Sequence, residues 1–431
     1  MRGREGAFKI MEQEVFLPFA RTDGKIVSFR PSELRRHLYI CGASGTGKTT
    51  LLKNLTVSLL RNNFGVGVLD PHGDLVQDLL SYIPRRRTNQ VLLFNPLDIS
   101  RPIGLNVLEN LKEEHKYLVV DNLVTIFKNL FGSEFWGPRS GYIFTNALWV
   151  LLSQPRPLSL AFLPKLLLDH SFRNRLMKRV KDPLVLRFFE QEYNRYKEDY
   201  RQEVIAPLLN KVGALLLNPL IRNIIGQTRS TFDFRKLMDE GGIFFANLDK
   251  GQLGSEASKL LGSLLITKIQ LAAMSRSELP EEKRRDFFLF VDEVQGFITE
   301  SSFEAILSEA RKYHLALIMA NQFLEQLPPS VLASIFGNVG NLVVFRVSAR
   351  DGQYLEKEFQ FLVKAEELQT LPDFTVYIKK SSQIGRYPLT TLPPFPKVGT
   401  EQNPEVVLKV SRLRHGRSRR RVERWLRRKL R

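Results

Sequence analysis

The feature that most constrains the fold is the octapeptide at residues 42–49, GASGTGKT, which fits the pattern G-x-x-x-x-G-K-[ST] at every fixed position. An apolar run at residues 37–42 leads into it, and a segment of helical period begins near Lys48. In a strand–loop–helix setting, the N–H groups of such a loop and the helix N-terminus converge on phosphates. The context therefore favours nucleotide binding over an ordinary tight turn.

Each residue type in the loop has a chemical reason to be there. Glycines permit close approach of the backbone to phosphate oxygens. Lys48 supplies a point charge to the β- and γ-phosphates, and the Thr49 hydroxyl is placed to ligate Mg²⁺. The sequence thus predicts ATP and Mg²⁺ as cofactors, held by Gly42, Ala43, Ser44, Gly45, Thr46, Gly47, Lys48, Thr49 and Thr50.

Short apolar runs separated by amphipathic segments predict a parallel sheet covered by helices, the doubly wound α/β class. Each run is apolar on both alternating faces, as in strands buried on both sides. The predicted strands are 37–42, 64–70, 91–96, 242–248, 286–293, 315–322 and 341–348, and the predicted helices of the core are 48–61, 255–275 and 302–313.

The chain is expected to divide into an ATPase core and an insertion. Residues 108–225 show helical period and almost no strand signal, which indicates an inserted all-helical domain. Segments 374–380 and 386–391 are expected to form a hairpin, after which a proline-rich stretch leaves the core. The predicted division is an N-terminal segment 1–35, core 36–107, all-α insert 108–232, core 233–396 and a basic tail 397–431.

A pair of carboxylates ends the run at residues 286–293. Asp292 and Glu293 follow five apolar residues, so a buried strand would present both at the carboxyl edge of the sheet, where doubly wound folds bind ligands. Asp292 is predicted to coordinate Mg²⁺ through water, and Glu293 to polarise the attacking water. Alone the pair is a weak signal, but together with the glycine loop it predicts ATP hydrolysis. The two motifs are 244 positions apart, which the insert explains.

Positive charge is concentrated at the C-terminus. The net charge is +19, and the segment from Ser411 onward contributes eleven Lys or Arg against Glu423 alone. Such a balance points to a polyanion. Within this tail four apolar residues share a helix face, which would lie on nucleic acid, acidic lipid or a partner protein; a solvated, disordered arm is the alternative. The four are Val422, Trp425, Leu426 and Leu430.

The remaining composition indicates a cytoplasmic protein. No signal peptide or membrane-spanning run is visible, since the apolar stretch at 145–168 is broken by polar residues and prolines. The single cysteine, Cys41, excludes an internal disulfide and is expected to be a small buried side chain.

Over about residues 36–394 the chain resembles the HerA/FtsK superfamily of RecA-like hexameric motors, and most closely the type IV secretion coupling proteins that pump DNA during conjugation. Besides the two nucleotide motifs, the resemblance rests on sequences at 70–74 (DPHGD), 136–139 (WGPR), 308–313 (SEARKY) and 320–322 (ANQ), and on the helical insert. It implies a RecA-like P-loop core with a mostly parallel sheet and an inserted all-α domain. We do not expect the family's N-terminal transmembrane helices in this sequence, so a soluble relative, or a motor with a different role such as DNA processing in the cytoplasm, is an alternative to docking at a secretion channel.

The resemblance also assigns residues. It implies that Gln322 reads the γ-phosphate and that Arg311 acts in trans on the ATP of a neighbouring subunit; the alternatives are a strand cap and a surface arginine. For residues 70–74, a simple tight turn and a contact with the nucleotide are equally supported. For Trp136 and Arg139 two interpretations remain open: an exposed aromatic residue, or a contact with a base or phosphate.

The predicted function is an ATP-driven DNA translocase that acts as a ring, expected to be a hexamer, with DNA in a basic central channel. The alternatives are an ATPase that energises protein secretion or assembly without binding DNA, and a nucleotide-dependent binding or scaffold protein with slow turnover. The basic tail favours nucleic acid, although it is also a candidate for contact with a membrane or the secretion apparatus.

Overall fold

The computed structural model describes residues 14–132, 136–298, 300–381 and 383–430. They contain one twelve-stranded sheet in the order β2-β1-β12-β10-β9-β3-β8-β7-β4-β6-β5, with β11 paired to β10. The strands are β1 (Leu17–Thr22), β2 (Lys25–Phe29), β3 (Leu38–Cys41), β4 (Gly65–Asp70), β5 (Val91–Phe94), β6 (Ile243–Asn247), β7 (Phe287–Val291), β8 (Leu315–Asn321), β9 (Asn341–Val344), β10 (Thr375–Lys380), β11 (Gln383–Ile384) and β12 (Leu389–Thr391).

All seven predicted core strands are present, and they form the parallel part of the sheet from β9 to β5. Each is apolar on both faces because helices cover both sides. In β3, for example, Leu38 and Ile40 belong to one hydrophobic cluster, and Tyr39 and Cys41 belong to the other. Cys41 is fully buried, as predicted.

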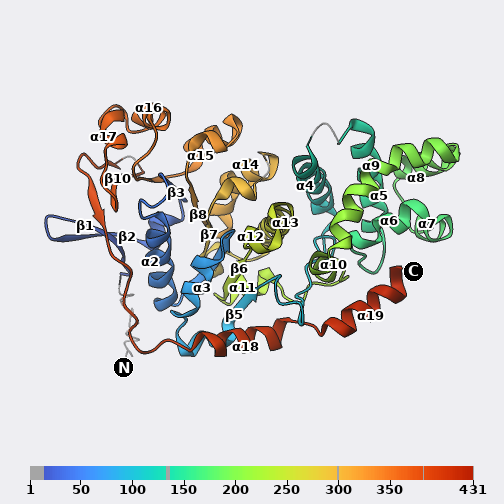
Figure 1. Cartoon of the computed structure of the whole chain (residues 1–431), viewed down its shortest axis with the longest axis horizontal. Coiled ribbons are helices and arrows are strands. Elements are labelled where there is room, and N and C mark those ends of the chain that lie inside the picture. The colour runs from blue at the N-terminus through green and yellow to red at the C-terminus, as the bar shows by residue number, and fades with distance from the viewer. Residues whose placement is uncertain (1–13, 133–135, 299, 382, 431) are drawn as a thin grey trace, which may run out of the picture.

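Antiparallel strands extend the sheet on one side (Figure 1). The predicted hairpin at 374–391 is present: β10 pairs with β12, and β11 adds a short rung at its tip. The β1–β2 hairpin, which was not predicted, pairs through β1 with β12. Residues 1–13, which include the region searched for a signal peptide, lie outside the described residues.

Helices α2 and α3 pack on one face of the sheet, and α13 to α17 pack on the other. The predicted helices at 48–61 and 255–275 coincide with α2 and α13, while 302–313 is α14 followed by a 3₁₀ turn, η8. The helices of the core are α1 (Pro31–Leu34), α2 (Lys48–Arg61), α3 (Asp74–Leu80), α11 (Phe234–Asp239), α12 (Lys250–Leu253), α13 (Ser255–Ser275), α14 (Glu300–Glu309), η8 (Ala310–Tyr313), α15 (Pro329–Asn338), α16 (Ala349–Glu358) and α17 (Ala365–Gln369).

Between β5 and β6 the chain leaves the sheet and forms a group of helices beside it (Figure 1). As expected, the described residues from 108 to 225 contain no strand. The helices are α4 (Glu113–Phe131), α5 (Pro138–Leu152), α6 (Leu163–Leu168), α7 (His170–Met177), α8 (Pro183–Arg187), α9 (Glu198–Leu217) and α10 (Pro219–Ile225). No single helix among the described residues is long and apolar enough to cross a membrane; α9 and α10 pass that test only as a pair bent by 98°.

The basic tail forms two helices, α18 (Pro404–His415) and α19 (Arg419–Leu430), which run from beneath the sheet to the helical insert (Figure 1). Helix α18 covers the edge strand β5, and the Ser411 hydroxyl accepts a hydrogen bond from Leu93 N at 2.8 Å. The alternative of a disordered arm is therefore wrong, because apolar side chains of the tail pack against other parts of the same chain.

Candidate active site

The glycine loop connects β3 to α2 through backbone conformations that only glycine adopts easily. Gly45 and Gly47 have φ of +78° and +116°. A Cβ on Gly47 would also lie 2.8 Å from the Phe374 ring, and one on Gly42 would lie 2.5 Å from Phe345 Cβ. The loop is thus wedged against β9 and β10 on one side. Around Gly45 nothing lies within 4 Å of a Cβ position, so the other side is open.

Lys48 is the first residue of α2, and its side chain folds back over the loop. Its Nζ donates hydrogen bonds to Gly42 O at 2.6 Å and Ala43 O at 2.9 Å. Burial lowers the pKa of Lys48, and the charges of Glu293 and Asp292 oppose that shift. The Lys48 ammonium is therefore buried and lies within electrostatic range of two carboxylates at the same edge of the sheet. A group in this position is suited to contact the β- and γ-phosphate oxygens of a nucleoside triphosphate.

Sheet register brings the carboxylates to the loop. Strand β8 lies between β3 and β7, with Cys41 opposite Asn321 and Val291 opposite Met319. All three strands are parallel, so the residues that follow them lie at the same carboxyl edge. Lys48 and Asp292 are 244 positions apart in the sequence, but the strands that lead to them are separated only by β8 and end at the same edge of the sheet.

Asp292 is buried at the end of β7. Burial raises its pKa to about 6, with further contributions from the neighbouring carboxylates of Glu293 and Asp70. Its Oδ1 accepts a hydrogen bond from Glu293 N at 3.0 Å, which fixes the side chain. A carboxylate held in this way, short of compensating positive charge, is a favourable ligand for a divalent cation.

Glu293 lies in the left-handed region, with φ of +48°, a conformation that costs a non-glycine residue free energy and often marks a functional position. Its two carboxylate oxygens accept hydrogen bonds from Gln322 Nε2 at 2.8 Å and Gln295 Nε2 at 2.5 Å. The Glu293 side chain is thereby oriented by one residue from β8 and one from its own turn.

Two residues that help to hold the site in place, Gln295 and Tyr39, could not be identified from the sequence. Gln295 is one of many polar residues after a strand, and only the turn geometry places it on Glu293. Tyr39 donates a hydrogen bond to Asn321 Oδ1 at 2.6 Å, in the middle of the sheet, and so fixes the strand end that carries Gln322. The tyrosine reads as an ordinary core residue.

Thr49 and Thr50 lie in the first turn of α2, next to Lys48, and Thr49 is exposed at the helix N-terminus. The fold therefore brings the loop, Thr49, Asp292, Glu293 and Gln322 to one place. Thr49 and Asp292 supply the oxygen ligands that Mg²⁺ prefers. The residues present fit a magnesium-bound nucleotide.

Arg311 does not join this group. It lies in η8, which precedes β8, so it is at the amino edge of the parallel sheet, and its side chain is exposed. Within one chain it cannot reach the loop.

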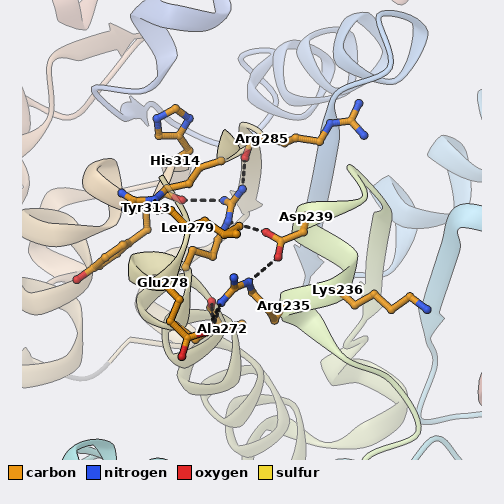
Figure 2. A network of polar contacts seen from close by, with 12 residues as sticks. Arg235, Lys236, Asp239, Ala272, Glu278, Leu279, Arg285, Tyr313 and His314 are labelled. Atoms are coloured by element: carbon orange, nitrogen blue, oxygen red, sulfur yellow. Dashed lines mark hydrogen bonds and ion pairs between the residues drawn. The ribbon is translucent and has the colours of Figure 1, made fainter. Parts of the chain in front are cut away.

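A network of polar contacts connects η8, the segment that carries Arg311, to neighbouring elements (Figure 2). The fully buried Arg276 donates hydrogen bonds to Tyr313 O at 2.7 Å, to Arg285 O at 2.6 Å and to Asp239 Oδ1 at 3.0 Å. The other oxygen of Asp239 accepts from Arg235 Nε at 2.5 Å. This network joins the end of α13, α11 and η8 beneath the start of β7.

Two motifs have structural roles. Asp70 accepts hydrogen bonds from His72 N and Val76 N, both at 2.9 Å, so its carboxylate holds the turn into α3. The expectation that Trp136 is exposed is wrong: it is buried and its ring packs against Phe127, Phe131 and Phe144. Arg139 is exposed, with its guanidinium over the Tyr200 ring.

The fold and the site define the class of protein, a RecA-like P-loop nucleoside triphosphatase with an all-α insertion. A family model described as "type IV secretion-system coupling protein DNA-binding domain" matches residues 21–359, most of the chain. The chain belongs to that family. No curated protein matches the sequence.

Solved structures agree on the fold. The bacterial conjugative coupling protein TrwB, in an unbound form, has a TM-score of 0.62 and 18% identity, with 90% of this chain and 92% of that chain covered. TrwB with ADP and Mg²⁺ gives 0.58 and 20%, covering 89% and 91%. VirB4 of Thermoanaerobacter pseudethanolicus gives 0.54 and 14%, covering 91% and 99%.

Proposed function

We propose that this chain is an ATP-driven DNA translocase that works in the cytoplasm as a ring, a hexamer, with DNA in a central channel. The observation that carries the proposal is the meeting of Lys48, Asp292, Glu293 and Gln322 at one edge of the sheet. Membership in a family described by DNA binding supports the choice of DNA as the partner.

The residues of the site have complementary roles in hydrolysis. The loop and Lys48 hold the phosphates, while Thr49 and Asp292 hold Mg²⁺, which neutralises charge on the phosphate oxygens. Glu293 would orient and polarise the attacking water, and hydrogen bonds from Gln322 and Gln295 hold its carboxylate in a fixed orientation for that role. The structures of TrwB with an ATP analogue and with ADP and Mg²⁺ support these cofactors.

Gln322 is suited to couple hydrolysis to motion. It donates to Glu293 and follows β8, whose other end carries η8 and Arg311. A change at the γ-phosphate would therefore be transmitted along one strand from the site of one subunit to the arginine that faces the next. In a ring, Arg311 would stabilise the charge that develops on the phosphoryl group in the neighbouring site.

The rate of ATP hydrolysis, measured without nucleic acid and with single- or double-stranded DNA over a range of salt, tests the proposal. We expect DNA to accelerate turnover, and the acceleration to weaken steeply as salt rises, because DNA contacts displace counterions. Equal turnover with and without DNA at low salt would favour instead an ATPase that energises protein secretion or assembly. Hydrolysis that Lys48→Ala leaves intact would reject the site itself.

A further inference from the structure

Helix α19 is attached to the helical insert by its apolar side. Val422 and Leu426 are buried, and the Leu426 side chain lies so close to Gly226 that a Cβ there would meet it at 2.9 Å. The Trp425 ring packs edge-on against Phe162 with centroids 6.2 Å apart. The predicted helix face therefore exists, but its partner is the insert of the same chain.

Polar contacts fix the same orientation. Glu423 accepts hydrogen bonds from Asn223 on α10 at 3.4 Å and from Arg419 at 2.6 Å. The residues before α19 follow the strand-like connection into the insert, with Arg417 N bonded to Pro102 O and Arg419 N to Ser100 O, both at 3.1 Å. These contacts define which side of the helix faces the insert.

This attachment leaves a stripe of arginines facing outward, which we call the arginine stripe: Arg420, Arg421, Arg424, Arg427 and Arg428. All five are exposed, and in the described part of the chain none of them forms an ion pair. The only carboxylate of α19, Glu423, is on the attached side. Neighbouring turns therefore repel, and the first turn, which holds Arg420 and Arg421, has no acidic residue to balance the helix dipole.

We propose that the arginine stripe is a docking surface for the phosphate backbone of DNA, outside the ATP site and separate from any central channel. The choice of DNA as partner rests on the proposed function. Arg420, Arg424 and Arg428 recur every four residues, or about 6 Å along the helix, so they present a row of positive charge to a duplex that carries one phosphate charge about every 1.7 Å of its axis. Guanidinium groups bind phosphate oxygens in a bidentate manner.

The structure favours DNA over a membrane for this surface. An amphipathic helix binds a bilayer by burying its apolar face among the lipids. Here that face is already packed against the insert, so only the charged face is available. The insert adds one basic residue beside the stripe, since Arg222 of α10 lines a groove together with Arg419, Arg427 and Glu423.

The test is DNA binding by the full chain without nucleotide, measured by fluorescence anisotropy over a range of salt. The variant is the triple substitution R420Q/R424Q/R428Q, which conserves helix propensity and should not change the melting temperature. We expect at least tenfold weaker binding at about 100 mM salt, and a slope of log affinity against log salt that is smaller by about 2 to 3. The charge-preserving R420K/R424K/R428K should retain most of the affinity.

The matched control is R21Q/K25Q/R386Q, which removes the same charge from exposed side chains that form no ion pair with the residues that the structure describes, at the β1–β2 end of the sheet. Its affinity should remain near that of the wild type, and equal losses in both triple variants would reduce the effect to net charge and overturn the proposal.

The remaining outcomes separate the two proposals. A wild-type chain that binds no DNA would sink the proposed function together with this one. A wild-type chain that binds DNA as tightly as the stripe variant would overturn this inference alone. If R420Q/R424Q/R428Q lost binding to phosphatidylserine vesicles but bound DNA as the wild type does, the inference would be overturned in favour of a membrane surface.

Discussion

At the scale of single residues, Asp292 combines a functional advantage with a cost in stability. Its burial raises the pKa to about 6, from 3.8 for an ordinary aspartate. Above pH 6 the folded chain holds an ionised carboxylate that prefers a proton, which costs on the order of 3 kcal/mol. The cost is fully present above the folded pKa and disappears as pH falls toward the unfolded value of 3.8.

Asp292→Asn should therefore stabilise the chain while it weakens Mg²⁺-dependent hydrolysis. The amide keeps the Oδ1 acceptor for Glu293 N and removes the buried charge. We expect a higher melting temperature than the wild type at pH 7.5 in EDTA, with the difference shrinking at pH 4.5. An unchanged or lower melting temperature at pH 7.5 would contradict the burial argument.

Glu293→Gln tests the role of the carboxylate in hydrolysis. The variant should bind ATP as the wild type does, because Glu293 is not part of the phosphate loop, and should lose turnover by about 10² to 10⁴ fold. Binding is checked with a fluorescent ATP analogue, and turnover by phosphate release. Glu304→Gln, on the exposed side of α14, is the control and should have normal turnover. Undiminished turnover in Glu293→Gln would remove this residue from the mechanism.

At the scale of elements, the Arg276 network holds α11, α13 and η8 together through an ion pair in which Arg276 is fully buried and Asp239 is partly exposed (Figure 2). Arg276→Met would leave Asp239 paired with Arg235 alone, and it would leave the carbonyl groups of Tyr313 and Arg285 without their donors. Removal of one partner of a fully buried pair costs about 3–5 kcal/mol, and the partial exposure of Asp239 places the cost near the lower end of that range. We expect a large drop in the urea midpoint of unfolding.

Arg350→Met provides the comparison, because Arg350 and Glu325 form a pair 2.8 Å apart with both side chains mostly exposed. Such surface pairs contribute about 0–1 kcal/mol. If Arg276→Met shifted the midpoint no further than Arg350→Met, the network would have no structural importance.

The sequence predicted the elements whose pattern is set by two-sided burial, and it missed those set by tertiary contact. Runs such as 286–293 could only be buried strands, and the glycine loop fixed the strand and helix on either side. In contrast, β1 and β2 are only partly buried, and β1 pairs with β12, which belongs to a distant hairpin. The local sequence of α19 predicted an apolar face but could not predict that this face packs against the insert.

The same distinction applies to the site. The loop and the acidic pair were predictable because each is a local string at a strand end. Their meeting needed only the rule that parallel strands end at one edge. Gln295 and Tyr39 were not predictable, since each acts through a hydrogen bond that the local sequence does not encode.

At the scale of the whole molecule, Arg311 does not contribute to the ATP site of its own chain. It lies in η8, at the opposite edge of the sheet from Lys48. The proposed ring brings the two edges of neighbouring subunits together. Arg311→Ala should bind ATP normally but reduce turnover of mixed rings below the sum of the parts.

Mixing the wild type with increasing fractions of Arg311→Ala measures this effect. A curve that falls below a straight line supports action in trans. Lys312→Ala, next to it and equally exposed, is the control and should give a straight line. A straight line for Arg311→Ala as well would mean that each subunit hydrolyses ATP independently.

The central claim is that ATP hydrolysis moves the protein along DNA. The most direct measurement is the rate at which the chain displaces streptavidin from the biotinylated end of a single- or double-stranded DNA. We predict displacement that requires ATP, at a rate that Glu293→Gln abolishes even though the variant still binds ATP and DNA. Displacement that is equal with and without ATP, or absent while DNA accelerates hydrolysis, would contradict the account.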